Sequence, residues 1–80
     1  MFFVYFLKSE KNDDVYIGST ENIERRLALH NAGKVRSTKP CRPWRLLGSE
    51  IYATRKEAVQ RERFLKTHQQ RELLKKRFEE

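Results

Sequence analysis

Five side chains in this sequence are of kinds that move protons or hold charged groups. They are two phenols, a guanidinium, an imidazole and a carboxylate: Tyr5, Tyr16, Arg26, His30 and Glu62. A phenol or an imidazole can exchange a proton, a guanidinium can hold an anion, and a carboxylate can hold a cation. If the fold brings these groups together, they can perform acid–base chemistry on an anionic substrate.

The two tyrosines lie on neighbouring predicted strands. In an antiparallel pair, the sequence numbers of opposed residues have a constant sum. If that sum is odd, such as 21 or 23, Tyr5 and Tyr16 point to the same face of the sheet. The alternative is two core tyrosines whose hydroxyls are satisfied by ordinary hydrogen bonds.

Arg26 and His30 are four residues apart on a predicted helix. They stack on one face, beside the apolar residues Ile23 and Leu27, so both can reach the same point above the strands. The alternative is an exposed helix with scattered polar residues.

Glu62 lies on the apolar side of a later predicted helix, among Ala58, Val59 and Leu65. Burying an unpaired carboxylate costs several kcal/mol by typical estimates. The carboxylate therefore needs either a basic side chain, as in a buried Glu–Arg pair, or a metal ion.

The elements that must position these groups follow from the apolar pattern. The first strand, 2–7, is continuously apolar, which is typical of a central strand buried on both faces. The other predicted strands and helices are listed here in chain order: strand 15–18, helix 20–31, strand 44–52, helix 54–66 and helix 70–78. This β-β-α-β-α-α order predicts an α+β fold, a small antiparallel three-stranded sheet flanked by helices, in one domain over residues 1–80.

Several residues mark where the predicted helices begin and end. Thr20 is expected to cap the first helix and Gly33 to stop it. Thr54 and Glu57 have the form of a capping box at the start of the second. The last helix is expected to pack through Leu73, Leu74 and Phe78, and it can cover Phe64.

The chain carries 18 basic and 11 acidic residues, a net charge of +7, concentrated in residues 21–46 and 55–80. This favours a polyanionic partner, of which nucleic acid is the usual one, over a surface that is merely well solvated.

No stretch predicts a membrane span or a signal peptide, so we expect a cytoplasmic protein. We also expect a monomer or weak dimer. The one cysteine, Cys41, excludes an internal disulfide, and we interpret it as an incidental loop residue.

Five elements in order resemble the GIY-YIG endonuclease superfamily, in particular its small stand-alone members, which are related to the nuclease domain of the excision-repair endonuclease. They are Val4-Tyr5-Phe6, Tyr16-Ile17-Gly18, the segment Ser19–His30, a loop with Ser37-Thr38-Lys39 and Arg42-Pro43-Trp44, and the helical set Ala58, Glu62 and Lys66. The first motif reads V-Y-F where the family has G-I-Y. The similarity spans about residues 2–78.

The resemblance implies a role for each matching residue. Tyr5 would help to activate the water nucleophile, and Tyr16 would position water or phosphate. Arg26 would stabilise the phosphate, and His30 would assist the tyrosine or bind phosphate. Glu62 would be the ligand of a single Mg²⁺ or Mn²⁺ ion.

Gly18 would provide the turn into the helix, and Lys66 matches a common basic position. The residues expected to contact nucleic acid are all basic: Lys34, Arg36, Lys39, Arg42 and Lys66.

The implied function is metal-dependent hydrolysis of DNA phosphodiester bonds in repair or recombination. Because 80 residues leave no room for a second DNA-binding module, sequence specificity should be low or supplied by a protein partner. The alternative is a non-catalytic nucleic-acid-binding module with the same fold, which binds through its loop cations and the basic residues beyond position 60.

Overall fold

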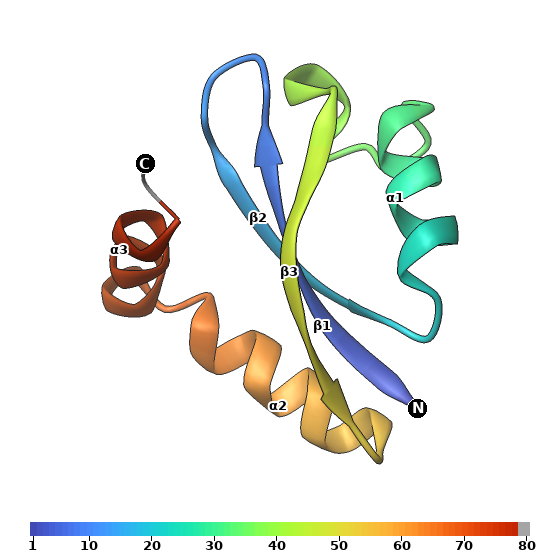
Figure 1. Cartoon of the computed structure of the whole chain (residues 1–80), viewed down its shortest axis with the longest axis vertical. Coiled ribbons are helices and arrows are strands. Elements are labelled where there is room, and N and C mark those ends of the chain that lie inside the picture. Colours follow the sequence, from blue (N-terminus) through green and yellow to red (C-terminus); the bar gives the residue numbers. More distant parts are fainter. Residues whose placement is uncertain (79–80) are drawn as a thin grey trace.

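The central strand of the sheet is β1, Phe2–Ser9, flanked by β2, Val15–Thr20, and β3, Trp44–Tyr52, in the order β2-β1-β3. Both pairings are antiparallel. The computed structural model describes residues 1–78. Its helices α1, α2 and α3 lie on both sides of the sheet (Figure 1). The predicted α+β fold, with its three strands and flanking helices, is confirmed.

The two faces of β1 support two separate clusters. Val4 and Phe6 pack toward α2 and α3, whereas Tyr5 and Leu7 pack toward α1 and Trp44. All four side chains on β1 are at most 3% exposed. A strand covered on both faces needs apolar residues at every position, which explains the unbroken apolar run.

The first helix, α1, spans Ile23–Asn31 and begins later than predicted. Thr20 does not cap it, because Thr20 is the last residue of β2; the predicted second strand was two residues too short. The cap is Asn22, whose side chain accepts a hydrogen bond from the Arg25 amide at 3.0 Å. Gly33 ends α1 as predicted: it has a φ of 75°, and the Lys34 amide bonds back to the Leu29 carbonyl.

The second and third helices are α2, Arg55–Leu65, and α3, His68–Arg77, so the last helix begins two residues earlier than predicted. Thr54 caps α2 by accepting from the Glu57 amide at 3.2 Å, as predicted. The expectation that α3 covers Phe64 is wrong, because that side chain stays 49% exposed. α3 instead buries Leu74 and leaves Leu73 half-exposed.

Gly18 does not form a turn, as the resemblance implied, but lies inside β2 directly opposite Tyr5. Its lack of a side chain makes room for the Tyr5 ring. A Cβ atom at Gly18 would lie 2.5 Å from the Tyr5 hydroxyl oxygen and 3.0 Å from a Tyr16 ring carbon. Glycine is therefore required by the close packing of the two phenols, not by backbone conformation.

We expect Gly18→Ala to destabilise the fold by about 1–3 kcal/mol, because the new methyl group overlaps a buried ring that cannot move freely. The matched control is Gly48→Ala in β3, where the nearest atom to a Cβ is Phe78 Cζ at 4.0 Å. That change should be neutral or stabilise by up to about 1 kcal/mol. Urea unfolding of both variants makes the comparison, and equal effects would contradict this account of Gly18.

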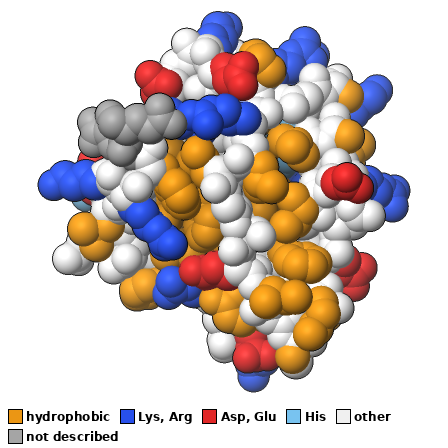
Figure 2. All heavy atoms as spheres, in the orientation of Figure 1, with side chains coloured by type: hydrophobic (Ala, Val, Ile, Leu, Met, Phe, Trp, Pro, Cys, Tyr) orange, Lys and Arg blue, Asp and Glu red, His pale blue; other side chains and the backbone are white. Residues whose placement is uncertain are grey.

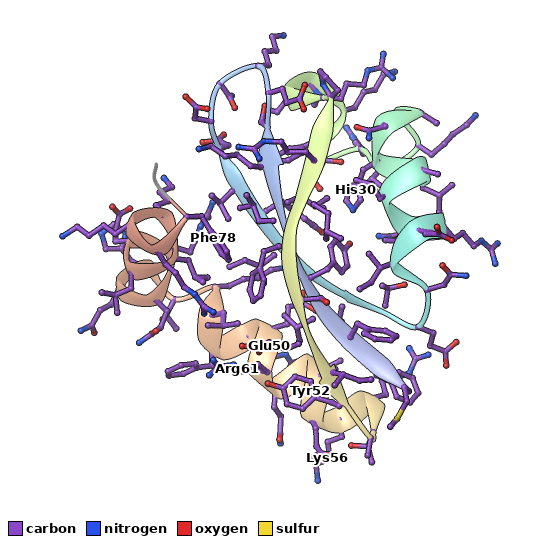
Figure 3. The ribbon with its side chains drawn as sticks, viewed as in Figure 1. His30, Glu50, Tyr52, Lys56, Arg61 and Phe78 are labelled. Carbon is purple, nitrogen blue, oxygen red and sulfur yellow. The ribbon has the colours of Figure 1, made fainter. Side chains whose placement is uncertain are left out.

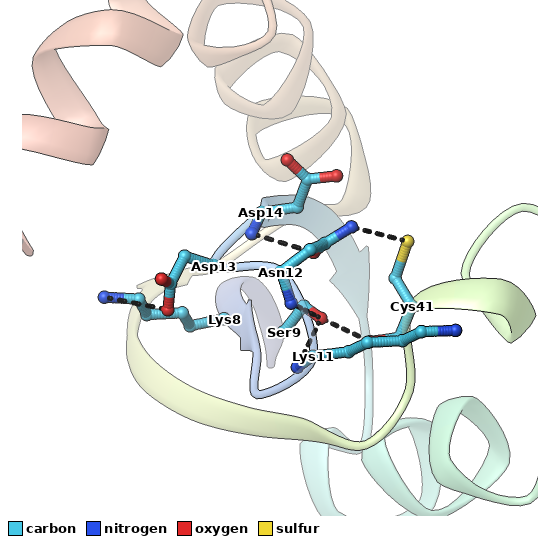
Figure 4. Close-up of polar contacts among 7 residues, drawn as sticks. All are labelled: Lys8, Ser9, Lys11, Asn12, Asp13, Asp14 and Cys41. Carbon is cyan, nitrogen blue, oxygen red and sulfur yellow. Dashed lines mark hydrogen bonds and ion pairs between the residues drawn. The ribbon is translucent and has the colours of Figure 1, made fainter.

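The β1–β2 hairpin holds the loop between α1 and β3 in place (Figure 4). Ser9 accepts hydrogen bonds from the Lys11 and Asn12 amides and donates one to the Cys41 carbonyl. Asn12 also donates to the Cys41 sulfur at 3.3 Å. Cys41 ends a single 3-10 turn, Lys39–Cys41, so these contacts fix the loop that carries Thr38.

Exposed hydrophobic side chains gather in the middle of the face shown in Figure 2, where β3 lies in front. Leu46 and Ile51 on β3 are 42% and 59% exposed. Basic side chains lie mostly around the rim of this view (Figure 2). Within residues 1–78, no helix combines the length and the apolar character that crossing a bilayer requires.

Candidate functional site

The register of β1 and β2 places both phenols on one face. Tyr5 lies opposite Gly18 and Leu7 opposite Tyr16, so the constant sum is 23. Because the sum is odd, Tyr5 and Tyr16 point to the same face of the sheet, a question that the sequence alone left open. The Tyr5 and Tyr16 ring centroids are 6.2 Å apart.

His30 reaches this pair from α1, and its side chain points toward the sheet (Figure 3). Its ring centroid lies 5.8 Å from that of Tyr5 and 5.0 Å from that of Tyr16. The Tyr5 hydroxyl and His30 Nε2 are 2.9 Å apart, and both residues are at most 1% exposed. The two phenols and the imidazole therefore form one cluster beneath α1.

Thr38 completes the cluster, although no individual role was predicted for it. Its hydroxyl oxygen lies 2.7 Å from His30 Nδ1, and its hydrogen is donated to the Val35 carbonyl. Because that hydrogen is used, Thr38 accepts from Nδ1–H, which leaves Nε2 as an acceptor for the Tyr5 hydroxyl. The sequence indicated only that Thr38 lies in a loop that resembles the corresponding loop of the GIY-YIG superfamily.

Burial sets the protonation of both partners in the free protein. Burial raises the pKa of Tyr5 to about 12, although a hydrogen bond from Arg26 opposes the shift. Burial, with the nearby Arg26 charge, lowers the pKa of His30 to about 4. At neutral pH the phenol is protonated and the imidazole is neutral, in agreement with the hydrogen bond between them.

The depressed pKa of His30 predicts that stability falls in weak acid. A group whose folded pKa lies below its unfolded value contributes stability that is present above the unfolded value, 6.5, and is lost as the pH falls toward about 4. We expect a loss of about 2 kcal/mol between pH 8 and pH 5. Urea unfolding at both pH values measures it.

The control for this loss is the exposed second histidine, His68. His68→Gln should retain the full loss between pH 8 and pH 5, whereas His30→Gln should be less stable at pH 8 but show little further loss at pH 5. A His30→Gln variant with an unchanged pH dependence would show that other groups cause the effect.

Glu62 is held by two hydrogen bonds from opposite sides. Ser19, in β2, donates to Oε1 at 2.6 Å, and Lys66 Nζ lies 2.7 Å from Oε2. Burial would raise the pKa of Glu62, but the Lys66 and Ser19 hydrogen bonds outweigh it and hold the pKa below its usual range. The Glu62 side chain is 20% exposed, and its cation is Lys66, the residue that follows α2, rather than an arginine.

Lys66 joins the carboxylate to the phenols around the edge of the sheet. Its Nζ lies 5.4 Å from the centroid of the Tyr16 ring. Tyr16 is on the α1 face, whereas Lys66 follows α2, on the other face. Contact is possible because β2 is an edge strand, so side chains from both faces can meet around it.

Arg26 is the fifth predicted group, and it lies on α1 beside the Tyr5 hydroxyl. A hydrogen bond with Tyr5 is the largest cause of the raised pKa of its guanidinium. Among residues 1–78, Arg26 forms no ion pair with a carboxylate. The guanidinium is therefore available to an anion that approaches Tyr5.

The Glu62 carboxylate alone provides only some of the ligands that a Mg²⁺ ion requires. Within the described chain there is no group of three or more histidine, cysteine or acidic side chains that could enclose a metal ion. Mg²⁺ keeps most of its waters and is commonly held by one or two carboxylates together with substrate phosphates. Glu62 suits such an ion, provided that Lys66 leaves Oε2.

The basic loop predicted to contact nucleic acid lies at the C-terminal end of α1. Its cations Lys34, Arg36, Lys39 and Arg42 are largely exposed, and none forms an ion pair among residues 1–78. Arg42 packs its guanidinium against Gly33. Lys66, the fifth predicted contact, is engaged with Glu62.

Known proteins match the chain over most of its length. A UPF0213 protein of Staphylococcus haemolyticus is 40% identical over 74 residues, covering 91% of this chain and 89% of that protein. The UPF0213 protein YazA of Bacillus subtilis is 36% identical over 74 residues, covering 89% of this chain and 74% of that protein. The solution NMR structure of a UPF0213 protein from Bacillus halodurans matches with a TM-score of 0.56 and 28% identity, covering 92% of this chain and 82% of that one.

A family model agrees with these relatives. The model of the GIY-YIG catalytic domain matches residues 1–77, which include every residue of the cluster around β2. The chain therefore belongs to the GIY-YIG catalytic domain family, a family of nuclease type.

Proposed function

We propose that this protein hydrolyses DNA phosphodiester bonds with the help of one divalent metal ion, Mg²⁺ or Mn²⁺. The observation that supports the proposal is that Tyr5, Tyr16, Arg26 and His30 lie together on the α1 face of the sheet, with Glu62 linked to them through Lys66 around the edge of β2. Phosphodiester hydrolysis needs an oriented water, a proton acceptor and positive groups at the phosphate oxygens. These side chains supply each of those requirements within a single site.

Each residue of the site has a role that its surroundings support. Arg26 binds the phosphate and lies beside the Tyr5 hydroxyl. His30 and Thr38 orient the Tyr5 hydroxyl. Once Tyr5 has lost its own proton to solvent, the phenolate accepts the proton of the attacking water. Tyr16 is only partly buried and contacts water or phosphate at the rim.

The metal ion would be held by Glu62, water and phosphate oxygens. When bound, such an ion polarises a phosphate oxygen and stabilises charge on it. Lys66 occupies Oε2 of Glu62 in the free protein and is 43% exposed, so its side chain can move into solvent when a stronger cation arrives. The loop cations Lys34, Arg36, Lys39 and Arg42 would bind DNA phosphates away from the cleaved bond.

We propose that residues 1–80 act as one domain of low sequence specificity in the cytoplasm, in DNA repair or recombination. A structured DNA substrate or a protein partner would then select the site of cleavage.

A panel of supercoiled, nicked, branched and single-stranded DNA, incubated with Mg²⁺ or Mn²⁺, tests the proposal. We expect nicking of at least one structure with the metal ion and none in excess EDTA. Nicking that is equal with and without EDTA would contradict metal-dependent hydrolysis by this site.

A second candidate is a non-catalytic nucleic-acid-binding module. Two features of the free protein favour this candidate. The pKa of Tyr5 is raised to about 12, so the phenol stays protonated, and Lys66 occupies Oε2 of Glu62, where a metal ion would bind. Such a module would bind DNA in EDTA with a steep salt dependence, and it would cut none of the substrates.

A further inference from the structure

A basic groove lies next to the candidate site, at the opposite end of α1 from the predicted loop. Its volume is about 370 Å³, and it is lined in part by Ser19, Glu21, Asn22, Arg25, Arg26 and Arg55. Three arginines and one glutamate give it a net positive charge. None of its residues apart from Arg26 was predicted to bind a ligand.

The groove is continuous with the candidate site through two shared residues. Arg26 is the neighbour of the Tyr5 hydroxyl, and Ser19 donates to Glu62. A strand with one phosphate at Arg26 can therefore continue directly into the groove.

Arg25 and Arg55 are both placed to receive that strand. Arg25 forms no ion pair among residues 1–78. Arg55 stacks 5.5 Å from the centroid of the Phe2 ring, which restrains its guanidinium. Its acidic neighbour Glu21 is 3.9 Å away, and both side chains are mostly exposed, so this pair contributes little and yields to a phosphate.

We propose, building on the function proposed above, that Arg25 and Arg55 bind the backbone phosphate next to the one held at Arg26. The ligand class is a nucleic-acid strand, and the groove sets the direction in which that strand leaves the site. Glu21 opposes binding, since its carboxylate lies beside Arg55 and repels phosphate.

The test is binding of a short fluorescent DNA duplex in EDTA, so that no cleavage occurs. Arg25→Gln/Arg55→Gln should weaken binding at low salt by about tenfold per arginine. It should also reduce the magnitude of the slope of log K against log salt by about 0.9, since the two arginines share one phosphate contact and each lost contact removes about 0.9. Glu21→Gln should strengthen binding.

The charge-matched control is Arg45→Gln/Lys56→Gln, on β3 and α2, whose side chains do not line the groove. An equal loss in this control, or an unchanged salt slope in the arginine variant, would overturn the proposal. So would NMR shifts at Arg25 and Arg55 with inorganic phosphate but not with DNA, which would indicate a site for small anions.

These outcomes are separate from those of the cleavage assay. Loss of binding in the arginine variant without cleavage by the wild type would leave the groove assigned and the nuclease proposal refuted. Cleavage by the wild type, together with DNA binding that does not depend on Arg25 and Arg55, would support the nuclease proposal and refute the assignment of the groove.

Discussion

Glu62→Gln is expected to reduce metal-dependent nicking about 10²–10³-fold, the usual effect of removing one preorganised electrostatic group. The amide keeps an oxygen that can accept from Ser19, so the shape of the site is retained. It carries no charge, so it holds Mg²⁺ or Mn²⁺ much more weakly. Folding stability should change by less than about 1 kcal/mol, because the lost partner, Lys66, is exposed enough to be solvated.

The matched control is Glu50→Gln. Glu50 is the second acid held by a cation from α2, with Arg61 Nε at 2.9 Å, and it also accepts from the Tyr52 hydroxyl (Figure 3). It lies in the cluster between β3 and α2, so its loss should leave nicking unchanged. Nicking by Glu62→Gln at the rate of the wild type would point to a contaminating nuclease and refute the proposed function.

Tyr5→Phe is expected to reduce nicking about 10²–10⁴-fold, the range for a general acid–base group. It should also destabilise the fold by about 1–3 kcal/mol, because buried His30 Nε2 loses its hydrogen-bond donor. Nicking rates and urea unfolding measure the two effects. Tyr52→Phe loses one hydrogen bond to Glu50 outside the site, so it should be mildly destabilised and fully active.

The pH dependence of kcat/KM tests whether Tyr5, rather than the neutral imidazole of His30 beside it, accepts the proton of the attacking water. If the Tyr5 phenolate accepts the proton, with a pKa of about 12 in the free protein, kcat/KM should rise about tenfold per pH unit from pH 7 to pH 9. If neutral His30 is the base, with a pKa of about 4, the profile should be flat over that range. A Tyr5→Phe variant that keeps the wild-type slope would exclude Tyr5 as the base.

Much of the fold follows from patterns within short segments. The unbroken apolar run of β1 and the capping residue Thr54 depend on neighbours close in the chain, and both were confirmed. One of the errors came where two local signals competed. Thr20 and Asn22 can both cap a helix, and only the extent of β2 pairing showed that Thr20 belongs to the strand.

The sequence alone determined the fold class, the two phenol-bearing strands and the need of Glu62 for a cation, because each depends on periodicity and burial within one element. Tertiary structure decided the strand register, the insertion of Gly18 under Tyr5, and the contact of Thr38 with His30. It also decided that Lys66 meets Tyr16 around β2. These depend on the distance between segments far apart in the chain, which is set by the packing of helices on both faces of the sheet.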